Sequence, residues 1–202
     1  MIRPIVFFGL ILVACTGCKK SESSATKHHS KIDACSLITK EEAGRIQNTT
    51  ISGTKGSENA DGNLLVSQCY YAATTPNASI SLAVTQADPK SASANGPRDY
   101  WKQVFGRFSD ENAEEKEKEQ AREEEKKKEQ AGRGREEEER VVPPKKIDGV
   151  GEQAYWAGNS FGGALYVLDG DLFLRISVGG PDDAQTKIDK SKSLAKKAIS
   201  RL

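Results

Sequence analysis

The sequence predicts an α+β domain in which a mostly antiparallel sheet packs on helices, and three observations support this fold class. Residues 79–86 alternate apolar and polar side chains, the period-two pattern of a strand with one covered face. Residues 164–178 form two apolar runs separated by an Asp-Gly pair, which is a strong hairpin signal. Polar capping residues precede two amphipathic helical segments, at Thr39 and at 181–183.

The ordered part of the chain is expected to begin at about Ile32 and to lead into a short helix. Thr39 and Glu42 have the spacing of a capping box, which predicts a helix that runs to about Gln47. Residues 48–63 are rich in glycine, serine, threonine and asparagine, so they are predicted to be a loop.

Strands are predicted next at 64–72 and 79–86, and helices at 99–108 and 183–202. The apolar sides of the two helices comprise Trp101, Val104, Phe105 and Phe108 in the first, and Ala184, Ile188, Ala195, Ala198, Ile199 and Leu202 in the second. Both helices are expected to pack on the same face of the sheet.

The hairpin has the firmest local pattern in the chain. Asp169-Gly170 tolerates positive φ angles and predicts a type I′ turn. One face of the second strand is expected to carry Leu172, Leu174, Ile176 and Val178, and the other Arg175 and Ser177. Residues 149–156 are predicted to be a turn that leads into a strand, since their two glycines are too sparse for a phosphate-binding loop.

A short internal similarity relates residues 67–72 to residues 152–157. Each stretch is followed by amphipathic strand sequence and then a helix. The similarity favours two related strand–strand–helix halves, at 32–109 and 141–202, and chance likeness over so short a stretch is the alternative.

Residues 110–140 differ from everything around them. They contain 14 acidic and 9 basic residues and no large apolar side chain. Favourable i,i+4 pairs such as Glu114–Lys118 predict a solvated charged helix, and a disordered insertion is the alternative.

The first residues have the features of a secretory signal peptide. Arg3 is followed by an apolar run over 5–14, too short to cross a bilayer, which takes about 20 residues. The run ends in Leu12-Val13-Ala14-Cys15, which resembles the lipobox of bacterial lipoproteins. The resemblance implies cleavage after residue 14 and lipidation of Cys15, typically including palmitate. A plain signal peptide, an uncleaved anchor and lipidation at Cys18 are the alternatives.

A lipidated Cys15 places the protein on a membrane, because two or more acyl chains anchor a protein stably. Thr16 replaces the Asp that typically retains lipoproteins in an inner membrane, so the outer membrane is expected in a Gram-negative cell. Residues 15–31 are polar and rich in serine and lysine, which predicts a flexible tether. The net charge of +1 does not indicate a nucleic-acid partner.

Export would place Cys35 and Cys69 in an oxidising compartment, where disulfides are common. A bridge between them would add about 3–4 kcal/mol by chain entropy. Two buried free thiols are the alternative.

A zinc-like spacing is also present, formed by Cys15, Cys18, His28 and His29. No metal site is expected there, because acylation would occupy one thiol and the histidines would lie in the flexible tether.

The folded part contains no histidine, so a Ser-His-Asp or Cys-His site is excluded there. Carboxylate pairs of the kind glycosidases use occur at Asp169/Asp171 and Asp182/Asp183, but these suit a turn and a helix cap. No catalytic, cofactor-binding or metal-binding residue is therefore predicted.

Residues 33–43 read Asp-Ala-Cys-Ser-Leu-Ile-Thr-Lys-Glu-Glu-Ala, Cys69 precedes an aromatic residue, and 149–155 read Gly-Val-Gly-Glu-Gln-Ala-Tyr. With these motifs, residues 33–202 resemble a family of small bacterial envelope lipoproteins of unknown function that begin D-x-C-x-L-[LI]-T-x-x-E. The resemblance implies an α+β domain with a Cys35–Cys69 bridge, and implies no activity. Residues 110–140 depart from the family pattern.

These observations predict a lipid-anchored, non-catalytic binding module of the cell envelope. Its partner would be an envelope protein, a glycan or lipid that meets the exposed sheet face or the loops. A structural spacer, in which the charged segment holds something away from the membrane, is the alternative, and an envelope enzyme is the third.

Overall fold

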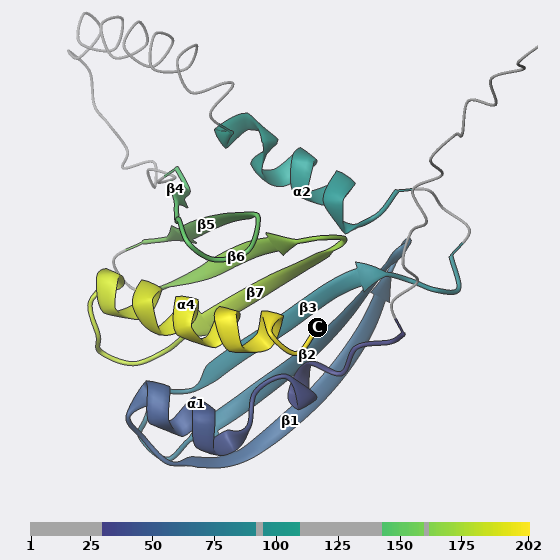
Figure 1. Ribbon diagram of the computed structural model, residues 1–202. Helices are drawn as coiled ribbons and strands as arrows, with labels where there is room; N and C mark the ends of the chain where they lie inside the picture. Colours follow the sequence, from purple (N-terminus) through teal and green to yellow (C-terminus); the bar gives the residue numbers. More distant parts are fainter. Residues whose placement is uncertain (1–29, 92–94, 110–142, 160–161) are drawn as a thin grey trace, which may run out of the picture.

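The computed structural model describes residues 30–91, 95–109, 143–159 and 162–202. Within these residues, seven strands form one antiparallel sheet in the order β1-β2-β3-β7-β6-β5-β4, accompanied by three α-helices (Figure 1). The predicted α+β class is confirmed. The predicted signal peptide, nearly all of the tether and the 110–140 insertion lie outside the described residues.

The described elements occur in the following order along the chain. The 3-10 turn η1 (Ala34–Ser36) and α1 (Lys40–Gln47) precede β1 (Ile51–Asp61), β2 (Leu64–Ala73) and β3 (Ile80–Ala87). Then come α2 (Pro97–Phe105) and the 3-10 turn η2 (Gly106–Phe108). The last part contains β4 (Lys145–Lys146), β5 (Gln153–Gly158), β6 (Gly163–Asp169), β7 (Leu172–Val178) and α4 (Ala184–Ile199). No described helix is long and apolar enough to cross a membrane.

The helix starts follow from their capping residues. The Thr39 hydroxyl accepts the Glu42 N–H at 3.2 Å, and the Glu42 carboxylate accepts the Thr39 N–H at 3.1 Å, which confirms the capping box. Asp183 caps α4 by accepting the Thr186 N–H at 2.8 Å. The helix ends at Ile199, short of the predicted end at residue 202.

β1 corrects the prediction that residues 48–63 form a loop. Ten residue pairs join β1 to β2, and the hairpin turns at Gly62, whose φ is +60°. β1 is an edge strand whose side chains are almost all exposed, so it needs no alternating apolar pattern. Backbone hydrogen bonds to β2 specify the strand, and these leave no signal in the side-chain sequence.

The β6–β7 hairpin is confirmed, but its turn type is not. Asp169 pairs with Leu172, so the two turn residues are Gly170 and Asp171. Gly170 has a φ of +57°, whereas Asp171 has no positive φ. A single positive φ at the first turn position is the pattern of a type II′ turn, and the predicted type I′ turn is therefore wrong.

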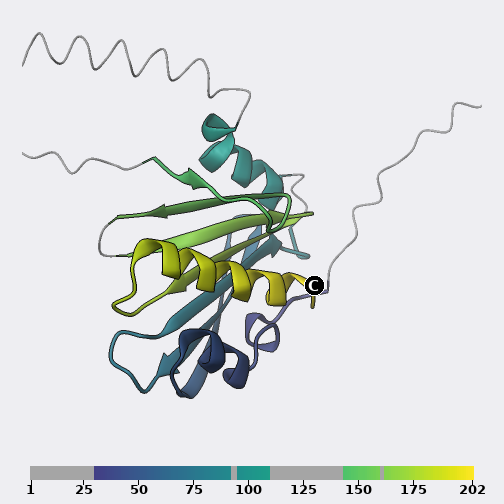
Figure 2. The same ribbon diagram turned by 60° about the vertical axis from the view of Figure 1, so that its left-hand side comes forward.

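The helices cover both faces of the sheet, which corrects the prediction that both long helices share one face. In β7, Leu174 and Ile176 belong to the larger core with α1 and α4, whereas Phe173 packs against Trp101 of α2. Neighbouring residues of a strand point to opposite faces, so α2 and α4 lie on opposite faces. Figure 2 shows α1 and α4 together in front of the sheet, with α2 apart from them.

The predicted apolar sides of the helices hold in part. Val104 is 36 % exposed and Ala184 is also exposed, so both predictions are wrong. Leu194 is fully buried although it was not predicted to be. The remaining predicted positions on both helices are buried or partly buried.

The two predicted halves are not equivalent. Residues 67–72 lie in β2, the middle strand of its meander, whereas 153–157 lie in β5, which two more strands follow before α4. The prediction of two strand–strand–helix halves is therefore wrong. The sheet consists of two three-stranded meanders that join where β3 pairs with β7, and β4 extends the second.

Ser191 offers a test of the packing under α4. Its side-chain oxygen is buried without a hydrogen-bond partner, the one such atom in the described chain. Ser191→Ala should raise the free energy of unfolding by about 1 kcal/mol, because it removes a desolvated hydroxyl and improves helix propensity. Urea unfolding measures this change. Ser193→Ala, on the exposed side of the same helix, is the control, and an equal gain there would contradict the prediction.

Candidate functional site

A disulfide between Cys35 and Cys69 fastens the N-terminal segment to the sheet. Cys35 lies in η1 and Cys69 in the middle of β2, with their Cα atoms 4.9 Å apart. The predicted bridge is confirmed, and the alternative of two free thiols is wrong. The predicted lipidation site Cys15, together with Cys18, lies outside the described residues.

Polar side chains on the sheet accept hydrogen bonds from the backbone of the first residues of the domain. The Ile32 N–H donates to Gln86 Oε1 at 2.8 Å, and the Ala34 N–H donates to Ser67 Oγ at 3.0 Å. Both acceptors are buried, and these bonds satisfy them where an unpaired polar group would be costly. The chain therefore enters on the face of the sheet that carries α1 and α4.

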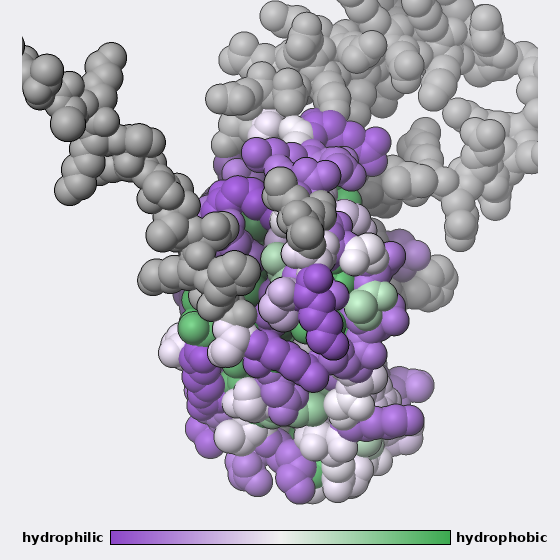
Figure 3. Space-filling view, turned by 90° about the vertical axis from the view of Figure 1, so that its right-hand side faces the viewer, coloured by the Kyte–Doolittle hydropathy of each residue, from purple (hydrophilic) through white to green (hydrophobic). Residues whose placement is uncertain are grey.

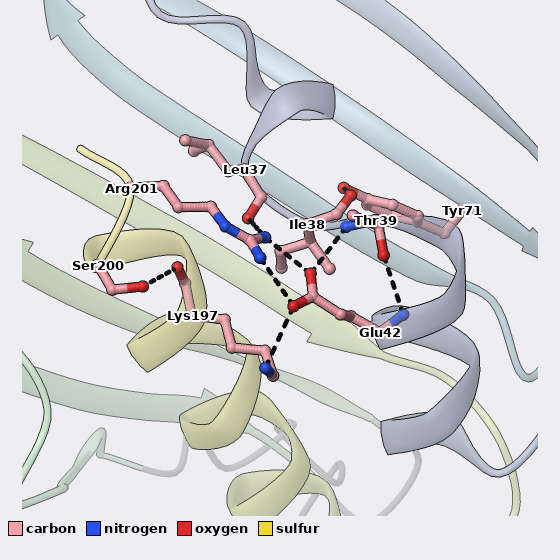
Figure 4. A network of polar contacts seen from close by, with 8 residues as sticks. All are labelled: Leu37, Ile38, Thr39, Glu42, Tyr71, Lys197, Ser200 and Arg201. Atoms are coloured by element: carbon pink, nitrogen blue, oxygen red, sulfur yellow. Dashed lines mark hydrogen bonds and ion pairs between the residues drawn. The ribbon is translucent and has the colours of Figure 1, made fainter.

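A polar network around Glu42 joins α1 to the end of α4 (Figure 4). Arg201 donates to both carboxylate oxygens of Glu42 at 2.7 Å and to the Leu37 carbonyl at 2.6 Å. Lys197 Nζ lies 3.2 Å from Glu42 Oε1. Beneath the network, Tyr71 donates to the Ile38 carbonyl at 2.9 Å, and burial raises the pKa of Tyr71 to about 12.

This network predicts acid sensitivity. Hydrogen bonds from Arg201, then the Thr39 N–H, hold the pKa of Glu42 well below its usual value. A carboxyl with a lowered folded pKa stabilises the fold above its unfolded pKa, near 4.3, and this contribution is lost as pH falls through the folded value.

Glu42→Gln should therefore lower the free energy of unfolding by about 1–2 kcal/mol at pH 7 and lose this effect in acid. Urea unfolding between pH 2 and pH 7 measures both features. Glu58→Gln is the control, because Glu58 forms only an exposed ion pair with Lys31, and such pairs contribute little. An equal effect of the two substitutions would contradict the prediction.

The carboxylate pairs have local structural contacts. They are Asp169 at the end of β6 with Asp171 in the β6–β7 turn, and Asp182 with Asp183 before α4. Asp182 pairs with Lys190 at 2.6 Å, and Asp183 is the helix cap. Burial, followed by the charge of Glu152, raises the pKa of Asp169. No group of histidine, cysteine or acidic side chains in the described residues is arranged to hold a metal ion.

α2 is held on its face by an aromatic core and by polar contacts. Arg98 donates to Glu152 at 2.8 Å and to the Gly170 carbonyl at 2.7 Å. The Trp101 indole N–H donates to Gln153 at 2.8 Å. These contacts fix α2 over the start of β5 and the β6–β7 turn.

Among the described residues, no other helix lies over that sheet face, and Tyr166, whose ring centroid is 5.2 Å from that of Phe105, lies where the cover of α2 ends. Paired residues of an antiparallel sheet point to the same side, so the register defines two rows of side chains here. We call these rows together the open face; they read Lys55–Tyr70–Ser81–Ser177 and Ser57–Gln68–Ala83–Arg175–Tyr166.

The open face is mainly polar. Tyr70 is 45 % exposed, and Gln68 donates to Ser81 at 3.0 Å. Arg175 Nε donates to the Tyr166 hydroxyl at 3.2 Å, with the guanidinium carbon 5.8 Å from the ring centroid. Figure 3, which shows the right-hand side of the view in Figure 1, is predominantly hydrophilic where residues are coloured, with hydrophobic residues in small separate patches.

Sequence reasoning found some of these groups and missed their assembly. The alternation in β7 correctly placed Arg175 and Ser177 opposite Leu174. Tyr70 and Gln68 had no signal that related them to β7, because β3 separates the two strands. Comparison with known proteins finds no match to a family model, to a curated protein or to a solved structure.

Proposed function

We propose that this protein is a lipid-anchored, non-catalytic interaction module of the bacterial cell envelope, which presents the open face to a partner. The observation that supports this proposal is that the helices cover the two faces of the sheet unequally. α1, α4 and the N-terminal segment cover one face, whereas α2 covers only part of the other. The lipobox-like Leu12–Cys15 sequence supports the anchor, and Thr16 favours the outer membrane in a Gram-negative cell.

Entry of the chain on the helical face supports this arrangement. The contacts of Ile32 and Ala34 lie on the side of the sheet opposite Tyr70 and Arg175. The described start of the chain therefore lies on the face that is already covered, and a segment leading to an anchor at Cys15 would join the domain there. Among the described residues, this leaves the open face accessible to an envelope component.

The intact mass of the protein extracted from membranes tests the anchor. We expect a chain that lacks residues 1–14, carries acyl groups on Cys15, and gains the mass of two hydrogens on reduction. A protein that washes off without detergent and has an unmodified Cys15 would overturn the anchoring proposal. Crosslinking in intact envelopes, with Cys15→Ala as the control, tests the interaction, and no enriched envelope component would count against it.

A structural spacer is the second candidate, and the ends of the charged segment favour it. The Phe108 carbonyl accepts from the Tyr155 hydroxyl at 3.1 Å, and Lys146 pairs with Tyr155 in the sheet. The chain therefore leaves and re-enters the domain beside one residue. Deleting 111–140 should leave thermal unfolding unchanged and reproduce the envelope phenotype of the null strain. If the deletion causes no envelope phenotype, the spacer is excluded, whereas the proposed interaction module is not affected by that result.

A further inference from the structure

Arg175 carries a positive charge that no acidic group of the described chain balances. It is half-buried on β7, which lies beside β3 near the centre of the sheet. Its contacts are with Tyr166, through Nε and the ring face, and no described carboxylate forms an ion pair with it. The Tyr166 contacts orient the guanidinium, and its terminal N–H groups have no hydrogen-bond acceptor in the part of the chain that the structure describes.

The surroundings of Arg175 reinforce this charge. The two rows of the open face contain Lys55 and Arg175 and no aspartate or glutamate. Arginine binds carboxylates through two parallel N–H···O bonds, and such charge-assisted bonds are about twice as strong as neutral ones. The open face is therefore complementary to an anion that carries a planar carboxylate.

We propose that the open face binds a carboxylated glycan, with Arg175 receiving a sugar carboxylate and Tyr70 stacking against a neighbouring sugar ring. This inference rests on the proposed role of the open face in the interaction module. An amphipathic tyrosine ring suits the apolar face of a sugar. Gln68 donates to Ser81, and Ser177 donates to the Gly163 carbonyl, but each of these side chains keeps a further acceptor or donor position for a sugar hydroxyl.

The shape of the surface favours a glycan over an acidic peptide. Peptides commonly add to a sheet edge or place side chains in apolar pockets. The open face lies on the broad side of the sheet, and its central positions carry short side chains at Ser81, Ala83 and Ser177. Tyr70 and Arg175 are two strands and two residues apart, about 12 Å by standard strand spacings, which suits a short oligosaccharide.

Isothermal titration with trigalacturonate, using the full protein purified from its envelope, tests the proposal. A neutral galactose trisaccharide and triglutamate are the comparison ligands. We expect trigalacturonate to bind at least tenfold more tightly than either and to weaken with added salt. Arg175→Gln should reduce its affinity at least tenfold, Arg175→Lys should restore only part of it, and Tyr70→Ala should reduce it severalfold.

Arg45→Gln is the matched control, since Arg45 is exposed on α1 on the covered face and its loss should leave binding unchanged. Thermal unfolding of each variant shows whether it is folded. No trigalacturonate binding, equal affinity for the neutral sugar, or an unaffected Arg175→Gln variant would overturn the proposal. Tighter binding of triglutamate would also overturn it, in favour of an acidic peptide. Each result is independent of the acylation of Cys15, so this inference and the anchor can fail separately.

Discussion

Replacing Cys35 and Cys69 together by alanine should lower the free energy of unfolding by about 3–4 kcal/mol. The bridge spans a sequence separation of 34 residues and therefore restricts the unfolded chain strongly. It also holds η1 against β2, at a position where Cys69 is fully buried. Its loss should release the N-terminal segment, whose other contacts with the sheet include the hydrogen bonds of Ile32 and Ala34.

Urea unfolding with and without reductant measures this effect. Reduction of the unmodified protein should shift its midpoint almost as far as the double substitution does, whereas the double variant should not respond to reductant. Comparing each protein with and without reductant therefore separates the effect of the bridge from other effects of the two substitutions. If reduction leaves the midpoint of the unmodified protein in place, the bridge does not stabilise the fold as we infer.

Trp101→Ala should lower the free energy of unfolding by about 3–5 kcal/mol, the usual cost of truncating a buried tryptophan. Trp101 is 3 % exposed, and its ring centroid lies 4.5 Å from that of Phe105 and 5.9 Å from that of Tyr155. Its indole N–H also donates a hydrogen bond to the side-chain oxygen of Gln153. The truncation should therefore loosen α2 from the sheet as well as leave a cavity.

Val104→Ala provides the matched control within the same helix. Val104 is 36 % exposed, so its truncation should cost less than about 0.5 kcal/mol. Denaturant unfolding monitored by circular dichroism compares the two variants. Similar losses would contradict the finding that α2 packs through Trp101 on the face opposite α4.

Local patterns predicted the elements that bury one side. The alternation at 79–86 corresponds to β3, the apolar runs at 164–178 to β6 and β7, and the capping box at Thr39 to α1. Each is specified by residues near in sequence, because a strand or helix that covers a core must place apolar residues at its own period. The disulfide between Cys35 and Cys69 was predictable without the fold, because an oxidising compartment favours a bridge between two cysteines of an exported domain.

Other features had no such local signal. β1 buries little, so its composition is that of a loop although it pairs along its length with β2. Val104 satisfies the apolar spacing of α2 yet points to solvent. Gly170 takes the first turn position because the pairing of β6 with β7 sets the register, and this shifts the turn by one residue from the Asp-Gly pair.

From the sequence alone came the α+β class, the positions of the covered strands and capped helices, and the cysteine pair that forms the bridge. The tertiary structure decided that α2 and α4 lie on opposite faces, that β1 closes one edge, and that Arg175 and Tyr70 share the open face. The physical reason is that a periodic pattern shows which side of an element avoids water. It does not show which distant element packs against that side. Nor does it show which polar side chains from different strands come together on a face that no helix of the described chain covers.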